Sequence, residues 1–498
     1  MVFFAIYTAS QFPYTYITME GDDFWVLTRG FWQLKLAMPP ALTNWLADFL
    51  MQFYGSPFVA ATIEALVLGL IGVLGHAALS PLLGRGWWRL LALLPPVLLG
   101  FYCTFSLSFL LQWVFFFALL LIYQKTLSYS IKGKTLSLPL WRGLVWSLLC
   151  VPVGFLLMKT PLLALLLVCQ TALAFKSFGA KKSAYWILPL ILLGVAPLTY
   201  SQQVSFIPFD QRYTDLGTDF DPITSRRHHE EEKIKKMVCL SDEGRWADLL
   251  YREHARTNAQ RGDGIALRYA LLAESALGTL PENIGLYPIR EESQFLFQHQ
   301  TDIVSQQFNR LFYLNLGVYD EAFHQAMEYG LLMRGGICFS SLRQMVDYSI
   351  EEGDWETAEK YLQILAKSSC HKEFVAQKTL SNSPLKGEKQ GSTTVNTLPL
   401  REGRGGSLRA DNFVGGYPLH VEMLRLARYY NEQESRSKIV NGKSSNGKCE
   451  IKKMLDYAIC SYMLRGDVNS FMVALKAFDI DKDKPLPKAY QEFMERYK

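Results

Sequence analysis

Residues 57–79 read PFVAATIEALVLGLIGVLGHAAL, a run of 23 residues in which Glu64 and His76 are the only ionisable side chains. A helix of about 20 apolar residues crosses the roughly 30 Å hydrocarbon core of a bilayer. A helix also satisfies its own backbone hydrogen bonds where water is absent. The stretch therefore predicts a transmembrane helix, and it sets the fold class as all-α.

The charged residues are distributed unevenly on the two sides of Gln202. Residues 1–202 hold 12 of the 51 Lys and Arg and 5 of the 46 Asp and Glu, so the rest of the chain holds 39 and 41. About a quarter of the residues in a soluble domain are charged. We therefore predict a polytopic transmembrane helix bundle over 1–202. The net charge of +5 leaves no extended basic face, which argues against a nucleic-acid partner.

Two apolar regions, 88–123 and 140–175, each hold 36 residues, which as one helix would extend about 54 Å and overshoot the bilayer. Each is therefore predicted to be a hairpin, with breaks near Cys103 and at Lys159-Thr160-Pro161. This gives about seven spans: 2–19, 57–79, 87–102, 104–123, 140–158, 161–176 and 184–201.

Basic residues orient the predicted bundle, because cytoplasmic loops retain Lys and Arg. Loops after the second, fourth and sixth spans carry nine basic residues, and the opposite face carries three, Arg29, Lys35 and Lys159. We therefore expect a bacterial inner-membrane protein with a cytoplasmic N-terminus and a periplasmic C-terminal domain.

Residues 203–224 have no helical period and are interpreted as a linker, and 225–498 as a soluble domain. A short turn motif recurs there at Gly244, Gly317, Gly353 and Gly466, and the segment from Gly353 resembles the turn and second helix of a tetratricopeptide repeat. The spacing of 36 residues between Gly317 and Gly353 is near the period of such repeats. We predict a TPR-like helical array in which each glycine forms a turn, the aromatic residue after it packs into the neighbouring unit, and Ala358 permits close helix contact. The alternative is an irregular helical bundle.

Residues 381–416 interrupt this pattern with Gly, Ser, Thr, Pro and charge, and they contain almost no core-forming residues. Such a composition cannot bury enough apolar surface to offset the entropy of ordering. We interpret the segment as a disordered insertion in the helical domain.

Glu20, Asp22 and Asp23 form an acidic cluster directly after the first predicted span. The loop that follows carries five aromatic residues suited to a membrane interface: Phe24, Trp25, Phe31, Trp32 and Trp45. This long aromatic loop is similar to the first exported loop of C-type membrane glycosyltransferases. The resemblance implies a catalytic role for the three acids, as a base or as ligands of a divalent metal bound to a lipid-linked sugar diphosphate. The alternative is a helix cap that also anchors the interface.

Glu64 lies about seven residues inside the second predicted span, where an ionisable group costs a few kcal/mol unless it is paired or reaches water. It therefore needs a partner. Gln112, Gln170, Lys159 or a hydrogen bond from the protonated carboxyl to another helix could supply one, and a functional and a structural role are equally compatible with the pattern.

Residues 20–60, the predicted span bundle and the helical tail together resemble an uncharacterised family of multi-pass inner-membrane proteins from Bacteroidota with a C-terminal helical-repeat region. The segment 39–54 in particular is similar to the part of that family that leads into its second span. The resemblance implies an architecture and no activity, and 381–416 is an addition to the family pattern.

Two functions from different classes fit this sequence. The first is a membrane protein that presents a periplasmic helical-repeat domain to a protein or cell-envelope polymer, with membrane lipid as its other partner and no cofactor. The second is a glycosyltransferase that uses a lipid-linked sugar. The first is favoured, because it requires only the architecture.

Overall fold

The computed structural model divides the chain into two compact units, and each is described by itself. Unit 1 comprises 1–232 and 366–374, and unit 2 comprises 233–365 and 375–498. The sequence pattern gave no indication that 366–374 belongs with the first unit. The structure describes residues 1–36, 39–83, 91–132, 138–178, 188–194, 214–215, 218, 220–289, 294, 302–333, 336–368, 370–382, 447–477 and 486–496.

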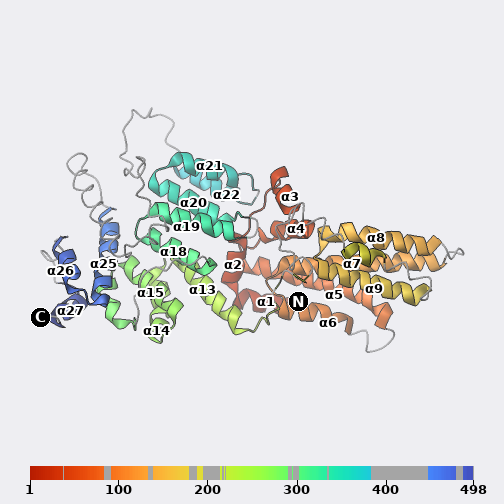
Figure 1. The fold of residues 1–498 in the computed structure, drawn as a ribbon, viewed down its shortest axis with the longest axis horizontal. Helices are drawn as coiled ribbons and strands as arrows, with labels where there is room; N and C mark the ends of the chain where they lie inside the picture. The colour runs from red at the N-terminus through yellow and green to blue at the C-terminus, as the bar shows by residue number, and fades with distance from the viewer. Residues whose placement is uncertain are drawn as a thin grey trace. The chain divides into compact units, whose positions relative to one another are not determined.

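Within these residues every regular element is helical and no strand is present, which confirms the all-α prediction. The helices of unit 1 are α1 (Val2–Gln11), α2 (Pro13–Gly21), α3 (Arg29–Leu36), α4 (Ala41–Met51), α5 (Pro57–Leu83), α6 (Leu94–Tyr102), α7 (Leu107–Lys132), α8 (Leu138–Leu157) and α9 (Thr160–Phe178). Helix α5 packs against α1, α6 and α7, and α7 also packs against α4, α8 and α9. Figure 1 shows α5, α7, α8 and α9 running alongside one another.

The prediction of seven complete spans was wrong. Among the described residues two helical segments are long and apolar enough to cross a membrane, Pro57–Ser80 and Leu107–Thr126. Three further apolar segments are shorter, Leu91–Tyr102, Leu144–Leu157 and Thr160–Lys176. The predicted seventh span, 184–201, lies largely outside the described residues.

Proline explains why two of the predicted spans are short. Helix α1 ends before Phe12, and Pro13 occupies the first turn of α2, because proline has no N–H to continue the preceding helix. Pro95 and Pro96 likewise begin α6 instead of kinking a longer helix. Both predicted hairpin breaks are confirmed, because α6 and α7 are separated at Cys103 and α8 ends two residues before Lys159.

Unit 2 is a series of short helices that includes most of α13, through which the boundary between the units runs. Its elements are α13 (Arg226–Asp242), a π-helical turn at Asp248–Arg252, α14 (Ala255–Gln260), α15 (Gly264–Leu277), α16 (Leu280–Asn283), a 3-10 turn at Ile284–Leu286, α18 (Ile303–Asn315), α19 (Tyr319–Leu332), α20 (Phe339–Glu352), α21 (Trp355–Leu365), α22 (Lys372–Asn382), α25 (Gly447–Arg465), α26 (Val468–Ala477) and α27 (Lys488–Arg496). Consecutive helices from α18 to α21 pack against one another, and Figure 1 shows this succession.

All four glycines of the predicted turn motif adopt the left-handed conformation, with φ between +68° and +84°. At Gly244, Gly317, Gly353 and Gly466 the glycine N–H donates to the carbonyl three residues earlier, and the next N–H donates to the carbonyl five residues before it. This pair of bonds is the Schellman motif, which ends a helix by satisfying its last carbonyls. The prediction that these glycines form turns is therefore confirmed.

Side-chain packing around the turn at Gly353 agrees with the repeat pattern only in part. Ala358 is buried, as expected for a site of close helix contact, whereas Trp355 is 47% exposed and is packed only in part. Trp246, the aromatic residue of the first turn, packs against the core of unit 2. The predicted insertion 381–416 begins at the end of α22 and otherwise lies outside the described residues, as does most of the predicted linker 203–224.

Candidate functional site

The acidic cluster lies at the C-terminal end of α2. Glu20 is in the last turn of the helix, Asp22 is its C-terminal flanking residue with its N–H bonded to the carbonyl of Thr18, and Asp23 follows. The negative end of the helix macrodipole disfavours carboxylates there by about 0.3–1 kcal/mol each. Asp22 is therefore a C-terminal flanking residue and not the N-terminal cap that a carboxylate stabilises, and the role of these acids as an interface anchor stays a prediction.

His371, in the segment 366–374, lies against this cluster within unit 1. Its Nδ1 atom is 4.0 Å from Oε1 of Glu20, and its ring stacks on Phe24 with 6.3 Å between centroids. Burial lowers the pKa of His371 to about 4, so the imidazole is neutral at pH 7. The contact with Glu20 is therefore between a carboxylate and an uncharged ring, and nothing in the sequence pattern pointed to it.

Glu64 is completely buried in α5, and its partner comes from α2. The hydroxyl of Tyr16 donates to Oε2 of Glu64 at 2.9 Å. Among the described residues, no hydrogen bond joins Glu64 to the expected partners Gln112, Gln170 or Lys159. The side-chain oxygen of Gln112 instead accepts the backbone N–H of Lys159 at 2.9 Å. The need for a partner was predicted correctly, but the partner was not.

Tyr54 lies beside Tyr16, the partner of Glu64. Its ring meets that of Tyr16 edge to face, with centroids 5.7 Å apart. Burial, then the charge of Glu64, and further Tyr16 and Asp23, raise the pKa of Tyr54 well above its ordinary value. Among the residues described, neither the Tyr54 hydroxyl nor Oε1 of Glu64 has a hydrogen-bond partner. Glu64 and Asp23 thus act on one buried hydroxyl.

A second group of buried polar side chains lies on α4, and the sequence analysis missed it. Lys35 on α3 forms an ion pair with Asp48, and their side chains are 4% and 0% exposed. One turn earlier on α4, the side chain of Asn44 accepts the hydroxyl of Ser108 at 2.7 Å, and Thr43 donates to the carbonyl of Leu157 at 2.5 Å. The available signal was the spacing of Asn44 and Asp48, four residues apart in a mostly apolar helix, which places them on one face.

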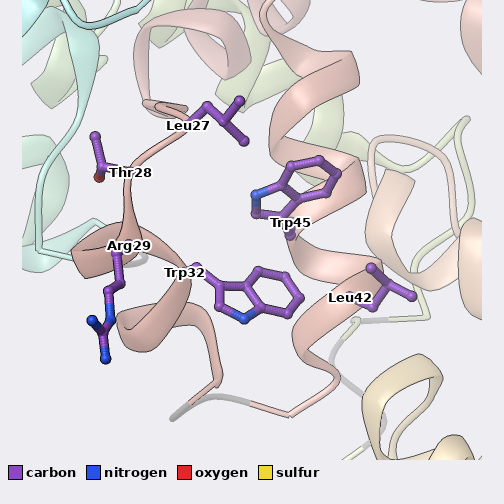
Figure 2. Close-up of a pocket in the computed structure, with 6 residues that line it drawn as sticks. All are labelled: Leu27, Thr28, Arg29, Trp32, Leu42 and Trp45. Carbon is purple, nitrogen blue, oxygen red and sulfur yellow. The ribbon is translucent and has the colours of Figure 1, made fainter.

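Helices α3 and α4 also border a surface hollow. It has a volume of about 430 Å³ and is lined by Leu27, Thr28, Arg29, Trp32, Leu42 and Trp45. Figure 2 shows the two indole rings and the two leucines around the hollow, with the guanidinium of Arg29 extending away from the rings. The rings of Trp32 and Trp45 meet edge to face at 6.1 Å between centroids. Two of the five aromatic residues of the predicted loop, Trp32 and Trp45, therefore line an open hollow.

The carboxylate of Glu232, on α13, caps the N-terminus of α2. Oε1 and Oε2 of Glu232 accept the backbone N–H groups of Tyr14 and Thr15 at 2.8 Å each, and Oε2 also accepts the Thr15 hydroxyl at 2.6 Å. These N–H groups are among those that the first turn of a helix leaves without an intrahelical partner. Glu232 therefore positions the helix that carries Tyr16 and Glu20.

The described side chains contain no group of three or more His, Cys, Asp or Glu arranged to hold a metal ion. Glu20 lies 4.0 Å from His371, the charge of Asp23 contributes to the raised pKa of Tyr54, and Glu64 accepts the Tyr16 hydroxyl. Unit 1 thus provides buried proton donors and acceptors around Tyr16 and, on α3 and α4, an apolar hollow.

A family model matches residues 1–392, which covers the whole described part of unit 1 and unit 2 as far as α22. It describes a family of unknown function, DUF6057. The chain belongs to this family. Helices α25 to α27 lie beyond the matched residues. No curated protein and no solved structure matches the chain.

Family membership confirms the expectation of an uncharacterised family, and its assignment to Bacteroidota stays a prediction. The similarity to C-type glycosyltransferases was also based on a seven-span core, which the described residues do not show, so it now rests on the aromatic first loop and the acidic residues.

Proposed function

We propose that this chain is an integral protein of the bacterial inner membrane whose C-terminal helices bind a protein or an envelope polymer in the periplasm. The observation that carries the proposal is the series of glycine-turned helices in unit 2, joined in one chain to helices long and apolar enough to span a bilayer. Stacked helical hairpins present extended surfaces that other proteins use for binding.

The outward side chains of unit 1 support a membrane location. On α5 the side chains of Phe58, Leu66 and Val73 are 63%, 69% and 68% exposed, and large apolar residues are also exposed on α6, α8 and α9. Exposed apolar surface of this extent marks an interaction with a membrane or another protein. The short helices thus have lipid-compatible faces as well, and we propose that they lie in the membrane beside α5 and α7.

Contacts at one end of unit 1 support the proposed orientation. Helix α4 contacts the start of α7 and the end of α8 through the side-chain bonds described above. After the predicted last span, the backbone N–H of Asp221 donates to the carbonyl of Tyr102 at 3.1 Å, beside the α6–α7 turn. The loops that were predicted to be exported therefore meet at one end, which is what a common side of the membrane requires.

The membrane part of this proposal is tested by fusing alkaline phosphatase after Lys498. We expect an active enzyme, because alkaline phosphatase requires the periplasm, and an inactive one when the reporter is fused after Lys132 at the opposite end of α7. Activity at the second position together with inactivity at the first would reverse the orientation. Release of the whole chain from membranes by alkaline carbonate would refute the membrane location.

The binding part is tested with a photoreactive amino acid placed at Trp355, whose ring is 47% exposed on α21. We expect a discrete cross-linked product in intact cells from this position. The same label at Met345, which is 6% exposed on α20, serves as the matched control and should give none. Absence of products from Trp355 and from the other exposed positions of α19–α21 would count against a binding surface there.

The alternative function is a membrane glycosyltransferase whose first loop carries the catalytic acids. It is supported by the electrostatic action of both Asp23 and Glu64 on Tyr54 and by the aromatic hollow in the same loop. Under this alternative, Asp22→Asn or Asp23→Asn should abolish the cellular phenotype at normal protein abundance, since loss of a catalytic base costs about 10²–10⁴-fold in rate. Under the favoured proposal both variants keep function.

A further inference from the structure

The hollow between α3 and α4 has an apolar lining and a basic residue at its rim, as a lipid-binding site requires. We propose that it binds an anionic glycerophospholipid, with one acyl chain against Trp32 and Trp45 and the phosphate at Arg29. The inference rests on the membrane location in the proposed function. It adds a specific lipid class and a specific site.

The lining of the hollow is suited to an acyl chain. Two indoles and two leucines supply most of its surface, and its volume of about 430 Å³ falls within the roughly 300–1,000 Å³ typical of ligand pockets. Leu27 is 77% exposed and Leu42 is 37% exposed, so the hollow opens to its surroundings. An apolar chain that entered it would bury these side chains.

Arg29 supplies the charge at the rim. Among the residues described, no acidic side chain pairs with it. Its guanidinium extends away from the indoles (Figure 2), as a group must if it is to meet a head group while the tail occupies the hollow. Guanidinium binds phosphate through two parallel hydrogen bonds, and it does not bind the tail. The site therefore favours a phosphate without a compensating cation over a zwitterionic head group.

The other cation of α3 is already neutralised. Lys35 is buried in its ion pair with Asp48, so it holds α3 against α4 and offers no charge to a ligand. This pair joins the two helices that border the hollow. Arg29 is thus the cation of this helical pair that a ligand can reach.

The surroundings of the hollow favour lipid over a soluble ligand. Leu34 is 36% exposed on α3, Phe53 is 45% exposed after α4, and Phe58 is 63% exposed at the start of α5. Trp residues beside such surface are typical of the bilayer interface. Phe49 stacks on Trp45 and meets Phe53 edge to face, so aromatic side chains lead from the hollow to the residues that precede α5.

The test uses the full chain in nanodiscs that contain a phosphatidylglycerol with a photoreactive acyl chain, or the matching phosphatidylcholine. Adducts are mapped by mass spectrometry. We expect adducts within residues 27–45, with phosphatidylglycerol favoured about fivefold, since one basic residue near an anionic membrane surface contributes about 1 kcal/mol. Arg29→Gln should remove that preference. Lys176→Gln removes one exposed charge at the last turn of α9 and should leave it unchanged.

A second variant distinguishes the loss of lipid binding from misfolding of the chain. Leu27→Asp alters an exposed side chain at the mouth of the hollow, so it should keep the fold and still abolish labelling of 27–45. Equal labelling by the two lipids, adducts confined to other segments, or displacement of the label by polyprenyl phosphate at a lower concentration than by phosphatidylglycerol would overturn the inference. Carbonate extraction of cell membranes that contain the chain separates the two proposals. If the chain stays in these membranes but forms no lipid adduct within 27–45 in nanodiscs, only the lipid site is refuted.

Discussion

The pair of buried tyrosines beside Glu64 allows one structural prediction to be worked out in full. Tyr16 and Tyr54 are both 0% exposed and their rings are in contact, but their hydroxyls differ. The Tyr16 hydroxyl donates to Glu64 at 2.9 Å, whereas that of Tyr54 has no hydrogen-bond partner among the described residues. Replacing each by Phe removes only an oxygen, so neither variant opens a large cavity.

Tyr16→Phe removes the only side-chain donor to the fully buried carboxyl of Glu64 among the described residues, and leaves the backbone of Phe105 as its remaining partner. Loss of one partner from a buried polar group costs about 1–3 kcal/mol. For a unit of this size about 1 kcal/mol changes the melting temperature by about 2–4 °C, so we expect a decrease of about 2–12 °C. Tyr54→Phe removes a hydroxyl that is desolvated without compensation, so the melting temperature should stay the same or rise.

The measurement is thermal unfolding of the full chain in detergent, followed by tryptophan fluorescence. Nine of the 11 tryptophans lie before residue 203, so this signal reports mainly on unit 1. A control cycle with Glu64→Leu should abolish the cost of Tyr16→Phe, because the partner is then absent in both variants. Equal destabilisation by Tyr16→Phe and Tyr54→Phe would refute the reasoning, since it would show that both hydroxyls are bonded.

Three other predictions follow from buried charges. Glu232→Gln weakens the bonds to the N-terminus of α2, so amide exchange at Thr15 should accelerate, with a loss of about 0.5–2 kcal/mol. Asp242→Asn leaves the guanidinium of Arg310, 2% exposed, without its charge partner, and should cost unit 2 about 3–5 kcal/mol in proteolysis-monitored unfolding. Arg310→Met should cost less, because Asp242 is 37% exposed and reaches water. Burial, then Asp320 and Glu328, raise the pKa of Glu321 to about 7. The folded state then binds this proton more tightly than the unfolded state, so stability should fall as pH rises from about 4.5 to 7, and Glu321→Gln should reduce that dependence.

Much of the fold could be predicted from local pattern. The run 57–79 marked α5, the excess length of 88–123 and 140–175 marked the two hairpin turns, and the four glycines marked Schellman turns. Each of these depends on residues near one another in the chain, through helix length, proline chemistry or the left-handed conformation of glycine. The number of spans could not be obtained in this way, because hydropathy does not show where Pro13 ends one helix and begins the next.

The contacts between the residues of the candidate site could be known only from the tertiary structure. Sequence indicated that Glu64 needs a partner and that 20–45 is unusual in its acids and aromatics. It did not show that Tyr16 is that partner, that His371 lies beside Glu20, or that Lys35 and Asp48 form an ion pair between the two helices that border the hollow. A buried charge needs a partner wherever it sits, so the chain itself reveals the need. Which side chain meets it depends on which helices pack together, and that is decided by tertiary contacts between residues far apart in the sequence.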